Sequence, residues 1–250
     1  MTPPRFPTPR RELALQAQSK LELREINSRS IVVRSWGKGP TVLCCHGWGG
    51  RGTQFFAFVQ PLIEAGYRVV TLDLPAHGDS SGRRTTLLES ASTLAAVARL
   101  EGPVHGLIGH SFGAGTALLA LDRFGATTEK LVLISCFANI EWSSRKFAEA
   151  FSVSPKLIGI MRKLAEQRYG RAYGKPWHWP ELSPLETIRS VTTDILLIHD
   201  INDHEIPYEH TQQLHQAAPT AQLLITRRLG HRKILMNPKS INPCIEFLDT

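Results

Sequence analysis

A serine stands between two glycines in the stretch GHSFG, with Gly109 two residues before Ser111 and Gly113 two residues after it. The apolar run PVHGLIGHS leads into the serine and an alanine- and leucine-rich segment follows, so the motif falls where a strand turns sharply into a helix. Such a turn lifts a hydroxyl above the sheet, and the N–H groups that open the helix face a developing negative charge. Ser111 is therefore a candidate nucleophile; a serine that merely caps a helix is the alternative.

A nucleophilic serine needs a base, and the base needs an acid that orients it. Both follow later runs of strand character: Asp200 and Asp203 in DILLIHDINDHEIP, and His231 in AQLLITRRLGHRK. The order serine, aspartate, histidine is the one that this kind of elbow requires. Among ten histidines, His231 is selected by this position in the chain.

The glycine-rich stretch HGWGG at 46–50 follows another apolar run. Its glycines allow the backbone to approach a ligand closely. We expect the backbone N–H groups of Trp48 and Phe112 to form an oxyanion hole. A phosphate-binding loop is the alternative, but the stretch lacks the glycine and lysine spacing of nucleotide-binding motifs.

The elements that would position these residues alternate along the chain. Two strands are expected at 20–26 and 30–36, and after them short apolar runs, typical of strands buried on both faces, alternate with segments of helix length. The predicted fold class is α/β, with a mainly parallel central sheet of about eight strands flanked by helices. The later strands are expected at 40–47, 67–75, 103–111, 130–136, 194–200 and 221–227, and the helices at 53–65, 84–100, 112–124, 207–218 and 238–248.

One interval breaks this alternation. Residues 137–191 contain no strand-like run, but they carry apolar positions at helical spacing and the aromatic cluster YGKPWHWP. Because a connection of this length is unusual, we predict a helical cap insertion here, within a core formed by 19–136 and 192–250. The proline- and arginine-rich residues 1–18 are expected to form a flexible extension.

The basic residues are concentrated in one part of the chain. The formal net charge is +7, yet eight Lys or Arg and two Glu lie between Arg145 and Lys175, which leaves only about +1 for the rest. This distribution argues against a nucleic-acid partner. No run is long enough for a transmembrane helix and no signal peptide is evident, so a cytoplasmic location is expected. The cysteine spacing predicts neither a metal site nor a disulfide framework, and no cofactor is expected.

Together these motifs resemble the α/β-hydrolase fold superfamily, in a form similar to serine esterases and thioesterases with a short helical cap. The resemblance covers about residues 20 to 249 and implies an antiparallel second strand and a cap after the sixth strand. It also implies Ser111 as nucleophile, His231 as base and Asp203 as acid. Asp200 remains the alternative acid, since it stands where the family's H-G-x-x-D loop has glycine. The motifs that carry the resemblance are HGWGG, DLPAHGDS at 73–80, GHSFG, HDINDHEIP at 199–207 and Gly230-His231.

The predicted activity is hydrolysis of carboxylic ester or thioester bonds in a small to medium acyl substrate, without a cofactor. A C–C bond hydrolase or lyase with the same triad is an alternative within the fold, and a non-catalytic binding protein is an alternative outside catalysis. The basic cap residues either form a solvated helix face or attract an anionic group on the substrate. The aromatic candidates for substrate binding are Trp48, Phe137, Phe147, Trp177 and Trp179.

Overall fold

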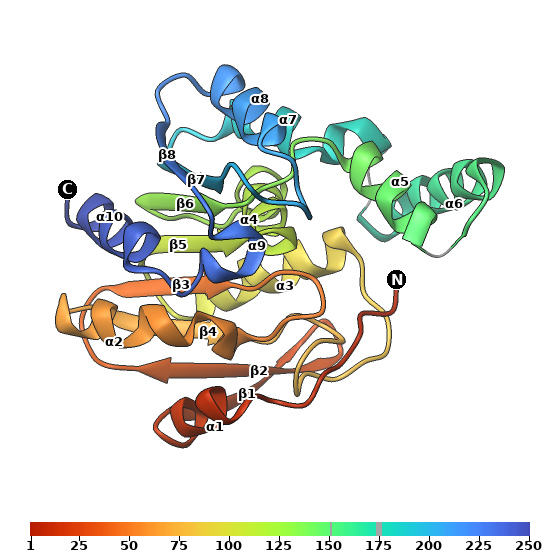
Figure 1. Ribbon diagram of the computed structural model, residues 1–250. Helices are drawn as coiled ribbons and strands as arrows, with labels where there is room; N and C mark the ends of the chain where they lie inside the picture. Colours follow the sequence, from red (N-terminus) through yellow and green to blue (C-terminus); the bar gives the residue numbers. More distant parts are fainter. Residues whose placement is uncertain (151, 174–176) are drawn as a thin grey trace.

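The computed structural model describes residues 1–150, 152–173 and 177–250 (Figure 1). At its centre lies an eight-stranded sheet in the order β1-β2-β4-β3-β5-β6-β7-β8. Strand β2 runs antiparallel to both of its neighbours, and the pairs from β4 to β8 are parallel. The strands are β1 (Lys20–Ile26), β2 (Arg29–Trp36), β3 (Thr41–Cys45), β4 (Arg68–Leu72), β5 (Val104–His110), β6 (Lys130–Ile134), β7 (Asp194–Asp200) and β8 (Gln222–Thr226).

Both faces of the sheet are buried, which explains the apolar runs in the sequence. On β6, Leu131 and Leu133 belong to a core shared with helices α3 (Leu87–Leu100) and α4 (Phe112–Phe124). The alternate residues Val132 and Ile134 belong to a second core, shared with α2 (Phe56–Glu64) and α10 (Pro238–Asp249). Side chains of a strand alternate between faces, so a strand covered by helices on both sides must be apolar throughout. The predicted α/β fold with a mainly parallel sheet is confirmed.

The remaining helices include α8 (Glu209–Ala217) after β7 and the short α9 (Gly230–Lys233) after β8. Local signals fix several boundaries. The Thr86 hydroxyl accepts the Glu89 N–H at the start of α3, and the Asn237 side chain accepts the Lys239 N–H at the start of α10. None of the described helices combines the length and apolar character needed to cross a lipid bilayer.

Helices also fill the interval that the sequence assigns to a cap. The chain leaves the carboxyl end of β6 and forms α5 (Ile140–Ala150), α6 (Pro155–Tyr173) and α7 (Pro184–Thr187), with 3-10 turns η2 (Trp179–Leu182) and η3 (Ile188–Ser190) before β7. Figure 1 shows α5 and α6 projecting to one side of the sheet, far from α2 and α10. The division into core and cap stays a prediction.

The N-terminal residues differ from the flexible extension expected. They include helix α1 (Arg10–Ala17), and the Arg5 guanidinium donates hydrogen bonds to the carbonyl oxygens of Ala76 and Ser80, at 3.2 and 2.6 Å. The buried Glu12 carboxylate accepts a hydrogen bond of 2.9 Å from Thr53 in η1 (Gly52–Phe55). The segment has partners on the β4 side of the sheet that its proline-rich composition does not reveal.

Candidate active site

Ser111 occupies a strained turn between β5 and α4. Its φ of 55° and ψ of −117° lie in a region that residues with a side chain rarely adopt. The turn brings α4 very close to the sheet, and only glycine fits at the two flanking positions. A Cβ on Gly109 would lie 2.6 Å from the Ala114 Cα, and one on Gly113 would lie 2.5 Å from the His46 carbonyl oxygen. Glycine at both positions is thus a steric requirement of the elbow.

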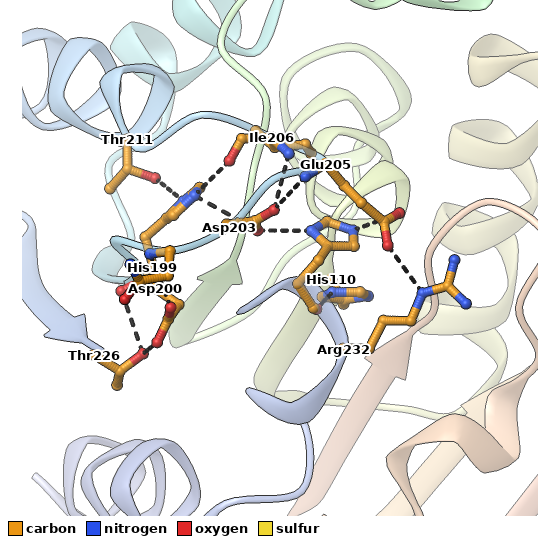
Figure 2. A network of polar contacts seen from close by, with 11 residues as sticks. His110, His199, Asp200, Asp203, Glu205, Ile206, Thr211, Thr226 and Arg232 are labelled. Carbon is orange, nitrogen blue, oxygen red and sulfur yellow. Dashed lines mark hydrogen bonds and ion pairs between the residues drawn. The ribbon is translucent and has the colours of Figure 1, made fainter. Parts of the chain in front are cut away.

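Asp203 and His231 are in direct contact, because the His231 Nδ1–H donates to Asp203 Oδ2 over 2.7 Å. The N–H groups of Glu205 and Ile206 donate to Asp203 Oδ1, each over 2.9 Å (Figure 2). Burial acts to raise the pKa of Asp203, but the hydrogen bonds and the charge of His231 outweigh it and lower this pKa to about 2. The carboxylate is therefore ionised at neutral pH. Nε2 of a neutral His231 can accept a proton, and the Glu205 carboxylate lies 3.9 Å from this nitrogen.

Asp200, the alternative acid, has different partners. Its Oδ2 accepts hydrogen bonds from the Thr226 hydroxyl at 2.8 Å and the Leu229 N–H at 3.0 Å. Among the described residues, Asp200 and His231 are not joined by a hydrogen bond. Asp200 instead ties the end of β7 to the end of β8 and to the loop that carries the histidine.

His110, the residue before the serine, joins the elbow to this histidine loop. Its Nε2–H donates to the His231 carbonyl oxygen over 2.9 Å, and the two imidazole rings lie 4.7 Å apart. Burial lowers the pKa of His110 to about 3, so the ring is neutral at physiological pH. The sequence motifs assign no role to His110. The available signal was its position inside GHSFG, directly before the serine.

The HGWGG loop at 46–50 lies against the serine elbow. The rings of Trp48 and Phe112 contact each other edge to face with centroids 5.1 Å apart, and a Cβ on Gly47 would lie 3.2 Å from the Ser111 Cβ. Over the described residues, the N–H groups of Trp48 and Phe112 donate to no other group of the chain. Both expected oxyanion donors are thus available beside the serine.

Buried polar residues hold this loop in place. The His46 Nδ1–H donates to the Gly47 carbonyl oxygen over 2.7 Å, while Nε2 accepts the Leu74 N–H over 3.0 Å. Burial keeps the pKa of His46 well below its usual range, so the ring is neutral and serves as donor and acceptor at once. The Asp73 carboxylate accepts the Gly52 N–H over 2.7 Å and fixes the chain that follows the loop.

The aromatic candidates separate into two groups. Phe137 packs against the first turn of α4, where a Cβ on Gly115 would come within 2.7 Å of its ring. Trp177 instead stacks on Phe124, the last residue of α4, with ring centroids 6.1 Å apart. A helix of 13 residues is about 20 Å long, so this stack lies at the opposite end from Ser111. The structure assigns Trp177 to packing rather than to the surroundings of the serine.

Trp179 also packs within the helical insertion. Its backbone N–H donates to the Glu166 carboxylate over 2.7 Å, and the Arg162 guanidinium lies 5.9 Å from the centre of its ring. The side chain of Phe147 lies outside the described residues. Of the four aromatic candidates whose side chains are described, Trp48 and Phe137 are the two that the structure brings beside the elbow.

A strained serine, an imidazole–carboxylate pair and two backbone N–H groups are components that nucleophilic acyl transfer uses. Among the described residues the pair is joined by a hydrogen bond, whereas Ser111 and His231 are not. Across residues 1–150, 152–173 and 177–250, no cluster of three or more His, Cys, Asp or Glu side chains is arranged to hold a metal ion. The four cysteines are buried, and burial raises the pKa of each thiol, which disfavours a thiolate nucleophile.

Comparison with known proteins gives the same class. The model of the alpha/beta hydrolase family matches residues 42–240, so the chain belongs to this family. An uncharacterised protein of Mycobacterium tuberculosis is 23% identical over 286 residues, covering 94% of this chain and 82% of the relative. A pimeloyl-[acyl-carrier protein] methyl ester esterase of Nitrosomonas europaea is 24% identical over 258 residues, covering 88% of this chain and 99% of the esterase.

A solved thioesterase domain from the curacin biosynthetic pathway superposes with a TM-score of 0.67 at 20% identity. The superposition covers 93% of this chain and 99% of the thioesterase domain. At this identity the match demonstrates a shared fold, in agreement with the sheet order and the antiparallel second strand described above.

Proposed function

We propose that this protein is a serine hydrolase that cleaves carboxylic ester or thioester bonds of small to medium acyl substrates. Ser111 is the nucleophile, His231 the general base and Asp203 the acid that orients the base. The N–H groups of Trp48 and Phe112 form the oxyanion hole, and Trp48 and Phe137 line the acyl site.

The observation that carries this proposal is the 2.7 Å hydrogen bond between His231 and Asp203, made on a loop that His110 fastens to the serine elbow. A histidine held by a buried, ionised carboxylate is restricted to the tautomer that can accept a proton at Nε2.

The chemistry follows from the roles of these groups. As the Ser111 oxygen attacks the substrate carbonyl carbon, His231 Nε2 takes the hydroxyl proton, and the oxyanion receives hydrogen bonds from the two backbone N–H groups. The protonated imidazole then gives its proton to the departing alcohol or thiol, which leaves an acyl-serine. Water attacks this ester, His231 accepts its proton and returns it to Ser111, and a carboxylic acid is released.

The similar proteins support the choice of bond. The Nitrosomonas europaea relative is named for a methyl ester and the superposed domain for thioester cleavage. Both bonds are cleaved through an acyl-enzyme, and neither reaction requires a cofactor.

The test is labelling with a fluorophosphonate probe together with hydrolysis of p-nitrophenyl acetate, butyrate and octanoate. The wild type should be labelled and active, whereas Ser111→Ala should show neither property and His231→Ala should lose at least about 10³-fold in kcat. Equal labelling of wild type and Ser111→Ala would refute the proposal. Labelling of Ser111 without ester turnover would direct the search to thioesters and then to C–C bonds.

A further inference from the structure

The outer face of α6 exposes a stripe of large apolar side chains. Leu157, Ile160, Met161 and Leu164 are 47, 47, 45 and 59% exposed. Their spacing of three and four residues puts them on one side of the helix, the arrangement that normally packs against a core. Yet the neighbouring Ile158, on the other side, is the one that is buried. Helix α6 therefore buries Ile158 toward the protein and exposes an apolar stripe to solvent.

Positive charges accompany this stripe. Arg168 and Arg171 continue the same helix face toward its carboxyl end, and Lys156 and Lys163 lie along one flank, all four exposed. As far as the described residues go, none of these four cations forms an ion pair, whereas the half-buried Arg162 pairs with Glu141 of α5 over 3.2 Å.

Among the described residues of α6, no carboxylate offsets these charges on the outer face. Glu166 is the sole acidic residue of α6, and it is turned inward, where it accepts the Trp179 N–H. The exposed face thus combines aliphatic side chains with a net positive charge. Its counterpart must be both apolar and anionic, because either property alone would leave part of the face without a complement.

The projecting position of α6 favours a flat binding partner over a concave one. Figure 1 shows α6 at the extremity of the molecule, on the side remote from α2 and α10, as a projecting rod. A convex helix with apolar side chains along its crest and Lys and Arg beside them is the form of a helix that lies in the interface of a bilayer.

We infer that the outer face of α6 docks on an anionic lipid surface. The four aliphatic side chains enter the boundary between headgroups and acyl chains, and the lysines and arginines contact the lipid phosphates. This inference concerns binding alone and holds whether or not Ser111 is a nucleophile. It also gives the basic segment a role that a solvated helix face would lack.

The test is co-sedimentation of the full chain, carrying Ser111→Ala, with vesicles of phosphatidylcholine alone or with 30 mol% phosphatidylglycerol (about one anionic lipid in three). Binding should require phosphatidylglycerol and weaken in about 0.5 M salt. Lys163→Gln with Arg168→Gln should lower the partition coefficient about 25-fold, since each cation near an anionic surface contributes about fivefold. Ile160→Gln with Leu164→Gln should lower it about tenfold or more.

Two matched controls test the location of the effect. Leu21 and Leu23, 52 and 65% exposed on the edge strand β1, receive the same paired change to glutamine, as do the exposed Lys38 and Lys239. Both controls should bind vesicles as the parent does. Absence of binding to anionic vesicles, or equal loss in control and α6 variants, overturns the inference. A dimer in sedimentation velocity that is lost with Ile160→Gln and Leu164→Gln, without vesicle binding, would overturn it in favour of a second copy.

Discussion

Replacing His110 should make the protein less sensitive to acid. Histidine in an unfolded chain has a pKa of about 6.5, whereas burial lowers the pKa of folded His110 to about 3. Between these values the unfolded state binds a proton that the folded state excludes, so stability falls as the pH drops below 6.5 and levels off near 3. Each pH unit costs about 1.4 kcal/mol, so at pH 4.5 His110 alone removes about 2–3 kcal/mol from the free energy of unfolding.

The substitution His110→Gln isolates this contribution. The glutamine amide can take the place of Nε2–H and keep the hydrogen bond to the His231 carbonyl oxygen, but it does not titrate. Urea unfolding at pH 7.5 and pH 4.5 measures, for wild type and for the variant, how much the free energy of unfolding falls on acidification. The loss in the variant should be smaller by about 2–3 kcal/mol. Other buried histidines contribute equally to both proteins and cancel in the difference.

Two features make this comparison decisive. The pKa of Asp203 is lowered to about 2, so the stability that its ionised form provides is lost only below about pH 4, outside the range compared. His178→Gln alters an exposed histidine and should leave the loss on acidification as it is in wild type. If His110→Gln loses as much stability as wild type, within about 0.5 kcal/mol, His110 is not a buried neutral histidine and the reasoning fails.

Asp203→Asn should lower kcat/KM by about 10⁴-fold at neutral pH, because an amide N–H facing His231 Nδ1 favours the wrong tautomer. Asp200→Asn should instead lower the free energy of unfolding by about 1–3 kcal/mol and reduce kcat/KM less than about tenfold. Esterase kinetics and urea unfolding of both variants check this, and the reverse pattern would exchange the roles of the two aspartates. Gly113→Ala should destabilise by about 3 kcal/mol or more, since its Cβ meets backbone at the end of β3, whereas Gly159→Ala, with open space around its Cβ, should stabilise α6 by about 0.5–1 kcal/mol. Thermal unfolding measures both, and an unaffected Gly113→Ala protein would contradict the close packing of the elbow.

The parts of the fold that local sequence encodes were predicted well. A strand buried on both faces needs continuous apolar residues, so the runs at 130–136 and 194–200 predicted β6 and β7 to within two residues at each end. The elbow was predictable for a similar reason, because glycines at 109 and 113 are required by backbone contacts only a few residues away or on the adjacent strand. The choice between two aspartates three residues apart depended on the side-chain directions in one loop, which the sequence does not specify.

Features that depend on distant partners were not predictable. His110 donates to a carbonyl oxygen 121 residues further along the chain, and a backbone acceptor carries no mark in the sequence. Arg5 likewise donates to carbonyl oxygens beyond β4, so a segment whose composition predicts no partners packs on the protein. Trp177 illustrates the converse: an aromatic residue in the insertion suggested a pocket, but its stacking partner is at the far end of α4.

The two hydrogen bonds of the buried His46 ring limit which residues can replace it in laboratory selection. It donates a hydrogen bond to the Gly47 carbonyl oxygen of its own loop and accepts one from the Leu74 N–H, through two nitrogens on opposite edges of one rigid ring. An amide could reproduce one of these bonds but not both at that separation. A library randomised at this codon and selected for ester turnover should therefore return histidine almost alone, although the residue takes no part in the reaction. Conservation within such a library would report the rigidity of the oxyanion loop rather than its chemistry.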